Sequence, residues 1–100
     1  MAKLIRHMVI FNLVHGKDSQ EEIKFLKDGQ ELLTSIPAVK DFQVLRQVSV
    51  KNDYNFGFSM VFETSEDYAA YNNHPVHRDF VASRWEKEVT KFLEIDFEDL

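Results

Sequence analysis

Apolar and polar residues alternate along the first part of the chain, and this alternation predicts a strand over residues 4–14. Val9 and Phe11 point to one face of this strand, because side chains two apart share a face. Met8 and Ile10 point to the other face, which is therefore also apolar. We expect both faces to be covered, one by helices and the other by a different surface.

A helix is predicted to follow, and its start is marked in the sequence. Ser19-Gln20-Glu21-Glu22 is a capping box, with serine at the N-cap and glutamate three residues later. Apolar residues then recur at helical spacing as far as Ile36, and Pro37 ends the helix. Gly29 lies inside the helix, where glycine costs roughly 1 kcal/mol relative to alanine.

Two further alternating stretches, residues 39–50 and residues 56–62, predict a β-hairpin. The polar residues 51–55 would form the turn between them. In the second stretch, alternate residues beginning with Phe56 are large and apolar, whereas those beginning with Gly57 are smaller. The third strand therefore has one strongly apolar face.

The second helical region is predicted in two pieces. Thr64 or Ser65 caps a short helix that ends near Asn72. Pro75 suits the first position of another helix, which runs to about Lys87. Alternation over residues 89–97 predicts a last strand.

The element order is thus β-α-β-β-α-β in a single domain, residues 1–100. This order predicts an α+β, ferredoxin-like fold with a four-stranded antiparallel sheet and helices on one face. The other sheet face carries enough large apolar side chains to be an interface, so two sheets facing each other would form a closed, barrel-like homodimer.

Composition narrows the function classes. The net charge is −5, and no Lys/Arg-rich run is present to follow a nucleic acid backbone or an anionic membrane. The chain has no cysteine, which excludes disulfides, thiol catalysis and thiolate metal sites. No run approaches the roughly 20 apolar residues of a membrane span. We therefore expect a cytoplasmic protein without nucleic acid or membrane partners.

The segment from Tyr71 to His77 holds the most obvious candidate chemistry. Pro75 at a helix start places His77 in the first turn, where the helix dipole lowers the pKa of a nearby histidine. A neutral imidazole can act as a general base near pH 7. Tyr71 could donate a hydrogen bond to a developing oxyanion. His74 is more readily interpreted as a structural group.

Each of these residues also has a purely structural interpretation. His77 could pack at the helix start, Tyr71 could be a core residue with a satisfied hydroxyl, and His7 could be either a core histidine or the polar group of a pocket. His74 and His77 are three residues apart, but a zinc site needs further converging ligands, so no metal site is expected. No glycine-rich nucleotide fingerprint is present, and no cofactor is expected.

Two arginines and one further histidine complete the candidates. Arg46 and Arg84 interrupt apolar stripes and should pair with a carboxylate such as Glu63, Glu88 or Glu94. His15 lies at a turn and is expected to be in solvent.

The chain resembles the stress-responsive α/β-barrel domain (Dabb) family. The resemblance rests on residues 5–11, on residues 36–42 between helix and strand, and on residues 71–77 with the quartet His74-Pro75-Val76-His77. It covers nearly the whole chain and implies a dimeric barrel.

The resemblance implies less about activity. Some plant members are polyketide cyclases, in which a histidine acts as base and a tyrosine assists; the matching positions are His77 and Tyr71. His7 matches a pocket histidine. Phe56 stands where the cyclases have another histidine, and Gly29 where they have a bulkier aromatic residue. The pocket or substrate-binding residues expected here are His7, Phe25, Gly29, Phe56, His74, Phe80 and Trp85.

Two functional hypotheses follow. The first is a stress-responsive barrel-domain homodimer of undefined activity, with a small hydrophobic pocket near His77. The alternative is a cofactor-independent lyase or cyclase with His77 as base and Tyr71 as hydrogen-bond donor, acting on a hydrophobic carbonyl-bearing or phenolic compound. A cofactor-free monooxygenase-like barrel is a weaker alternative that rests on the fold alone.

Overall fold

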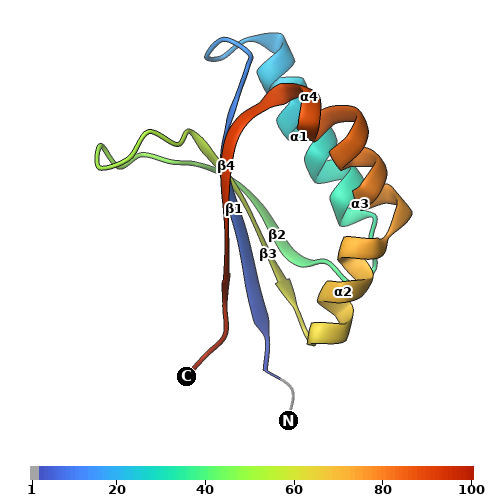
Figure 1. Cartoon of the computed structure of the whole chain (residues 1–100). Coiled ribbons are helices and arrows are strands. Elements are labelled where there is room, and N and C mark those ends of the chain that lie inside the picture. Colours follow the sequence, from blue (N-terminus) through green and yellow to red (C-terminus); the bar gives the residue numbers. More distant parts are fainter. Residues whose placement is uncertain (1–2) are drawn as a thin grey trace.

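The computed structural model describes residues 3–100, and its elements follow the predicted order (Figure 1). The strands are β1 (Ile5–Leu13), β2 (Lys40–Arg46), β3 (Phe56–Phe62) and β4 (Val89–Phe97). The helices are α1 (Gln20–Thr34), α2 (Ser65–Asn73), α3 (Pro75–Phe80) and α4 (Glu86–Glu88), and a π-helical turn over Val81–Trp85 joins α3 to α4.

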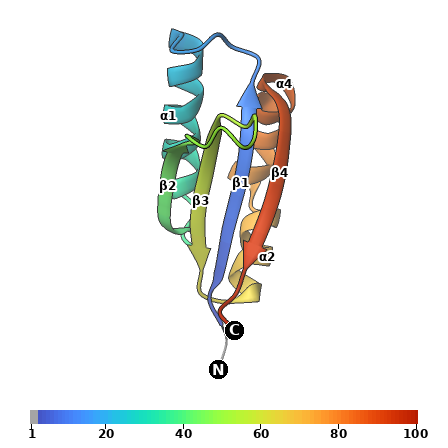
Figure 2. The ribbon, with the colours of Figure 1, turned by 90° about the vertical axis from the view of Figure 1, so that its left-hand side faces the viewer.

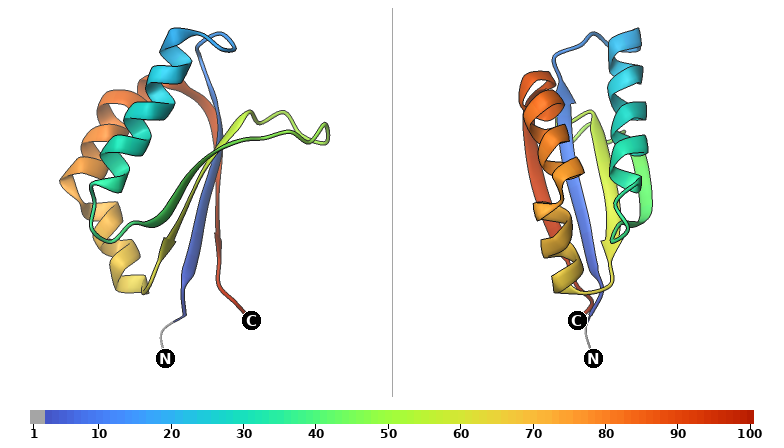
Figure 3. Two further views of the ribbon diagram at one scale, coloured as in Figure 1. Left: turned by 180° about the vertical axis from the view of Figure 1, so that it is seen from behind. Right: turned by 90° about the vertical axis from the view of Figure 1, so that its right-hand side faces the viewer.

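The four strands form one antiparallel sheet in the order β2-β3-β1-β4. The helices lie together on one face of this sheet (Figures 1 and 3). Figure 2 shows the other face, which no helix of residues 3–100 covers. This is the ferredoxin-like α+β arrangement that the sequence predicted.

The core lies between the helices and the sheet and consists largely of phenylalanine. Inward-facing residues of β1 and β3 are paired in the sheet, Val9 with Phe58 and Phe11 with Phe56. The largest fully buried side chains are Phe11, Phe25, Phe58, Phe62, Phe80, Ile36 and Met60. Six of the nine phenylalanines of the chain are therefore buried in one core. Those on β1 and β3 face it because side chains two apart share a strand face.

Side-chain caps fix the starts of α1 and α2. The backbone N–H of Glu22 donates to Ser19 Oγ at 3.2 Å, as the capping box predicted. The Glu22 carboxylate accepts from the N–H of Asp18, one residue before the cap, at 3.0 Å. At α2 the cap is Thr64, whose Oγ1 accepts from the N–H of Asp67 at 3.0 Å.

Gly29 brings α1 close to the sheet. A Cβ at this position would lie 2.8 Å from Cζ of Phe58 and 3.3 Å from Cζ of Phe80. Both rings are buried, so neither can move aside freely. The helix-propensity cost expected from the sequence is therefore offset by packing that only glycine permits.

The second strand is shorter than predicted. The sequence pattern suggested a strand to residue 50, but β2 ends at Arg46, and residues 47–55 form an arm that leaves the sheet on its uncovered side (Figure 1). Val48 is 85% and Val50 99% exposed. Their alternation resembles that of a strand, yet within residues 3–100 they have no neighbouring strand to pair with.

The last strand has the predicted bounds, and its two faces differ in character. Leu93, Ile95 and Phe97 lie on the uncovered face, opposite outward-facing residues of β1. Glu94 and Asp96 lie on the face that the helices cover. Seven large apolar residues lie on the uncovered face: Met8, Ile10, Leu45, Val61, Leu93, Ile95 and Phe97. Arg6, Lys40 and Lys91 lie on the same face toward the strand ends.

Charged side chains join α1 to the end of the last helix. Arg84 Nε donates to Glu88 at 2.5 Å and its Nη1 to Asp28 at 2.7 Å, which confirms the predicted Arg84–Glu88 pair and adds a second partner. His15 Nε2 lies 2.7 Å from the other Glu88 oxygen, so the expectation that His15 is solvated is wrong. Arg46 lies 3.6 Å from Asp18, none of its expected partners.

Candidate functional site

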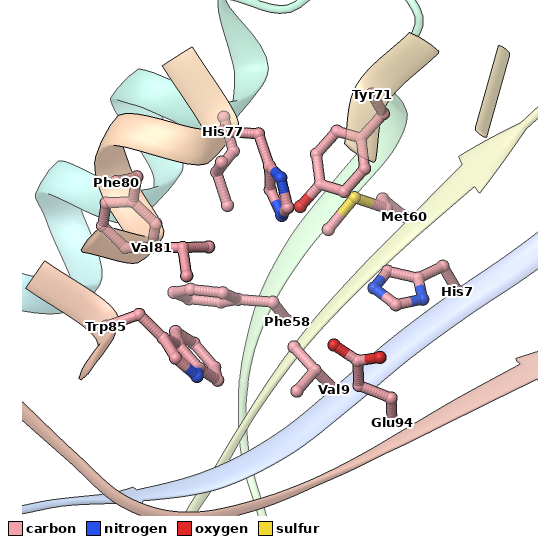
Figure 4. Close-up of a pocket in the computed structure, with 11 residues that line it drawn as sticks. His7, Val9, Phe58, Met60, Tyr71, His77, Phe80, Val81, Trp85 and Glu94 are labelled. Atoms are coloured by element: carbon pink, nitrogen blue, oxygen red, sulfur yellow. The ribbon is translucent and has the colours of Figure 1, made fainter. Parts of the chain in front are cut away.

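A pocket lies between the helices and the sheet, where α2, α3 and the π-helical turn face β1, β3 and β4 (Figure 4). Its lining residues are His7, Val9, Leu33, Phe58, Met60, Tyr71, His77, Phe80, Val81, Trp85 and Glu94. The enclosed space is about 40 Å³, and the hollow including its open mouth is about 360 Å³. The enclosed part has room for a few water-sized groups, so a larger molecule would extend into the mouth.

His77 presents one ring nitrogen to this pocket. Pro75 begins α3, and His77 follows in its first turn. Nδ1 of His77 lies 3.2 Å from the carbonyl oxygen of Asn72, which can only accept, so Nδ1 carries the proton. In the neutral ring Nε2 is then a free acceptor, and the ring points into the pocket (Figure 4).

The pKa of His77 is lowered, as predicted, but the main cause differs from the one expected. Burial of the half-buried ring lowers the pKa of His77 most, and the electrostatic effect of nearby His7 acts in the same direction. The bond to Asn72 and the charge of Glu94 oppose these effects. The imidazole is consequently neutral at pH 7.

Tyr71 lies beside His77 and is 3% exposed. The centroids of the two rings are 4.3 Å apart. Burial is the main cause that raises the pKa of Tyr71, and the charge of Glu94 adds to it. The hydroxyl therefore stays protonated at neutral pH and can donate to a bound molecule. Figure 4 shows its oxygen on the pocket side, next to the His77 ring.

His7 belongs to a second hydrogen-bonded group at the pocket wall. Its Nδ1 lies 2.6 Å from Oδ1 of Asp96, its register partner on β4. The Tyr68 hydroxyl donates to Oδ2 of Asp96 at 2.9 Å and lies 3.1 Å from His7 Nδ1. Asp96 thus orients the His7 ring, and Nδ1 faces the carboxylate instead of the pocket.

Glu94 adds a carboxylate that the sequence had suggested only as an arginine partner. It projects from β4 toward the pocket (Figure 4). Within residues 3–100 no hydrogen-bond donor or cation is bonded to it. Its charge raises the pKa of Tyr71 and also tends to raise that of His77, so Glu94 acts on both.

The structure brings together five of the residues expected at the pocket: His7, Tyr71, His77, Phe80 and Trp85. The other four do not line it. Phe25 and Gly29 lie behind Phe58 and Phe80. Phe56 lies under Arg46, whose Cζ is 5.2 Å from the ring centroid. His74 caps α3, because its Nδ1 accepts from the N–H of Val76 at 3.1 Å.

Several pocket residues were missed in the sequence. Val9, Phe58 and Met60 share a strand face with His7 and could have been found from the alternation of β1 and β3. Glu94 was not predicted, because the apolar residues of β4 that define its alternation lie on the opposite face of the strand.

Among residues 3–100, no group of three or more His, Asp or Glu side chains is placed to hold a metal ion. No helix in the described part of the chain combines the length and apolar character needed to cross a bilayer.

The fold and the pocket between sheet and helices define a ferredoxin-like barrel-domain protein. The sequence model of the stress responsive A/B barrel domain, Dabb, matches residues 5–99. The chain therefore belongs to this family.

Two similar sequences and one protein of the same fold illustrate the likeness. A Dabb protein with a ferredoxin-like fold from Mesorhizobium loti is 50% identical, with 98% of each chain covered and a TM-score of 0.97. A stress-response A/B barrel domain-containing protein from Arabidopsis thaliana is 29% identical over 101 residues, covering 92% of this chain and 83% of that protein. A dimeric ferredoxin-like protein of unknown function from Thermobifida fusca shares the fold at 18% identity, with 99% and 93% covered and a TM-score of 0.78.

Proposed function

We propose that this stress-responsive barrel-domain protein is a homodimer that holds a small, largely apolar molecule in the pocket beside His77. The proposal rests on the pocket having one apolar side and one polar side. Phe58, Phe80 and Trp85 form an apolar side, and polar groups of Tyr71 and His77 lie opposite them (Figure 4). Apolar walls with a few convergent polar groups are typical of small-molecule sites.

The exposed apolar side chains of the uncovered sheet face support the proposed homodimer. Leu93 is 47% and Phe97 57% exposed on that face. A contiguous apolar surface of this kind marks an interface more often than a solvated face. The protein of the same fold from Thermobifida fusca is a dimer. Pairing two such faces would leave the pockets accessible, because they lie on the helix side of the sheet.

The polar groups indicate how a ligand would be oriented. The Tyr71 hydroxyl can donate to a carbonyl oxygen, and Nε2 of His77 can accept from a hydroxyl or an N–H group. A compound with an aromatic or aliphatic group and one such polar group would contact both the apolar and the polar side of the pocket.

Trp85 provides the test. It is the only tryptophan of the chain and lines the pocket, so its fluorescence reports on the occupancy of the site. We would titrate purified protein with small phenols, aryl ketones and aryl-alkyl compounds and compare wild type with His77→Ala. Saturable changes that His77→Ala weakens about tenfold would support the proposal, since one hydrogen bond is worth about this much.

Arg78→Ala is the matched control, because Arg78 is the next residue of the same helix and is exposed. If the His77→Ala and Arg78→Ala variants bind the ligand equally tightly, His77 is not part of the ligand site.

A cofactor-independent lyase or cyclase is the second candidate. It is favoured by the hydrogen bond between Nδ1 of His77 and Asn72, which leaves Nε2 as the basic atom. In this proposal Nε2 removes a proton from carbon next to a carbonyl group, and the Tyr71 hydroxyl donates to the resulting enolate oxygen.

Deuterium exchange at the α-carbon of an aryl ketone in heavy water would test this step without knowledge of the full reaction. His77→Ala and Tyr71→Phe should each slow the exchange by about 100-fold, the size of general acid–base contributions. Tyr54→Phe, on the exposed arm, should leave it unchanged. Exchange that no variant alters would rule out this chemistry while leaving ligand binding intact.

We propose that the protein is located in the cytoplasm, as expected from its sequence. Fractionation of cells that produce the protein tests this location. Recovery in the membrane or extracellular fraction would contradict it.

A further inference from the structure

Several polar groups that line the pocket can accept hydrogen bonds, and one of them, Glu94, is a carboxylate. Nε2 of His77 is an acceptor, because Nδ1 carries the proton that bonds to Asn72. The Glu94 carboxylate has two acceptor oxygens and, within residues 3–100, no bonded partner. The Tyr71 hydroxyl can both donate and accept. No lysine or arginine is among the lining residues.

The remaining titratable group of the wall does not reverse this balance. His7 is 2.6 Å from Asp96, and Asp96 also accepts from Tyr68. If His7 is protonated, the His7–Asp96 pair has no net charge, and if His7 is neutral, the pair is negative. In both states the wall of the pocket, including Glu94, is net negative.

The apolar side of the wall includes Trp85, which is half-buried and is the ring there that a bound cation can reach. Trp85, Phe58 and Phe80 come together there, with ring centroids 6.4 Å apart for Trp85–Phe58 and for Trp85–Phe80. The faces of aromatic rings attract a positively charged group, and tryptophan does so most strongly. Glu94, an exposed residue of β4, and the half-buried Trp85 both line this pocket, and both favour a positively charged ligand.

We propose that the ligand of this pocket is a small primary amine in its ammonium form, attached to a short aromatic or aliphatic group. This inference rests on the proposed function, that the pocket binds a small molecule. The ammonium group donates to Glu94 and to Nε2 of His77, and the apolar group packs against Trp85. The three N–H donors can be shared among the acceptor atoms of the three side chains Glu94, His77 and Tyr71.

The dimensions agree with this assignment. The enclosed space of about 40 Å³ is large enough for an ammonium group and its first carbons, and the apolar group can occupy the mouth. A carboxylate ligand of the same size is disfavoured, because it would place a second negative charge close to Glu94 without a cation to balance it.

Three matched compounds test the assignment: 2-phenylethylamine, 2-phenylethanol and phenylacetate. They share the aromatic group and differ in charge. Measured by Trp85 fluorescence on the purified protein, the amine should bind about tenfold or more tightly than the alcohol, since a charge-assisted hydrogen bond is worth roughly that much. Phenylacetate should bind most weakly. Added salt should weaken amine binding and leave alcohol binding nearly unchanged.

Glu94→Gln removes the charge and keeps the side-chain shape. It should abolish the preference for the amine over the alcohol while leaving the thermal unfolding midpoint close to that of wild type. Glu86→Gln is the matched control, because it makes the same change in net charge on the exposed surface of α4.

The outcomes separate the two proposals. Alcohol binding as tight as amine binding, or a preference that survives Glu94→Gln, would overturn the amine assignment and leave the pocket function standing. If none of the three compounds changes Trp85 fluorescence but a phenol or an aryl ketone does, only the amine assignment fails. If no compound of either set does, the amine assignment and the proposed pocket function both fail.

Discussion

His77 depends on one backbone carbonyl for its chemical character. The oxygen of Asn72 accepts from Nδ1 at 3.2 Å, and this bond decides which nitrogen faces the pocket. Asn72 is in the last turn of α2, and His77 is in the first turn of α3. The break between the two helices at His74 therefore positions the carbonyl and the imidazole together.

The lowered pKa of His77 predicts a contribution to stability that depends on pH. The unfolded histidine takes up a proton near its usual value of about 6.5, whereas the folded one does so only at lower pH. The unfolded state binds more protons between these two values, so stability should decrease as pH falls through this window.

Denaturant unfolding at several pH values, for wild type and His77→Gln, measures this effect, and an NMR titration gives the folded pKa directly. Stability of wild type should fall more steeply than that of the variant below about pH 6.5. Parallel curves, or a folded pKa above that of a free histidine, would contradict the prediction.

Gly29 makes a second prediction at the scale of a single residue. Gly29→Ala adds a methyl group 2.8 Å from Cζ of Phe58, in a core without room for it. We expect a loss of about 1–3 kcal/mol in the free energy of unfolding, despite the better helix propensity of alanine. Urea unfolding measures the loss.

Gly16→Ala is the control for this change, because nothing lies within 4 Å of a Cβ at Gly16. It should change stability by less than about 0.5 kcal/mol. A Gly29→Ala variant as stable as wild type would show that α1 can move away from the sheet at little cost.

At the scale of elements, an ion-pair group connects α1 with the end of the last helix. Asp28 and Glu88 both bind Arg84, and their side chains are 20% and 17% exposed. Hydrogen bonds from Arg84 and Lys24 lower the pKa of Asp28. Burial alone would raise the pKa of Glu88, but hydrogen bonds from Arg84 and His15 outweigh it and lower the pKa. Both carboxylates therefore stabilise the fold in their charged form.

Glu88→Gln tests this connection. It should lower the free energy of unfolding by about 1–2 kcal/mol at pH 7, the cost of losing partly buried charge-assisted bonds. The difference from wild type should begin to shrink as pH falls below the ordinary glutamate value of 4.5, where the unfolded state takes up a proton first, and should vanish only below the lowered folded pKa of Glu88. Thermal unfolding of wild type and Glu88→Gln at pH 7 and at acidic pH measures this difference.

Glu86→Gln, on the same short helix and exposed, should have no measurable effect. Equal effects of the two substitutions would show that the Arg84 group adds nothing beyond ordinary surface charge.

At the scale of the whole molecule, the uncovered sheet face and the arm dominate. Residues 47–55 project from that side of the sheet and expose Val48 and Val50 almost completely (Figure 1). The sheet face beside it carries Leu93, Ile95 and Phe97. The arm and the sheet face both expose apolar side chains on the side of the sheet that the helices leave uncovered. A second copy of the chain bound to this side would cover them.

Leu93→Asp should therefore disrupt the proposed homodimer. A carboxylate in the middle of an apolar interface, present twice in a symmetric dimer, should weaken association by about 100-fold or more. Light scattering during size-exclusion chromatography measures the mass. Ile23→Asp, an equally drastic change at an exposed position of α1, should leave the dimer intact. A monomeric wild type, or a Leu93→Asp variant that stays dimeric, would contradict the proposed interface.

The element order, the helix caps and the two-faced first strand were all predictable from the sequence. They depend on local rules, such as the capping box at Ser19 and the alternation that ends at Phe62, which act between neighbours along the chain. The end of β2 was not predictable in this way. Whether Val48 continues a strand depends on a pairing partner, and alternation alone does not supply one.

The sequence by itself thus determined the elements, the fold class and the family, together with the candidates His77 and Tyr71. Only the tertiary structure decided which candidates meet. It placed Phe56 and His74 away from the pocket and brought Glu94 into it. The physical reason is that a pocket joins side chains from strands and helices far apart in the chain, and their meeting depends on sheet register and helix packing, which no local pattern specifies.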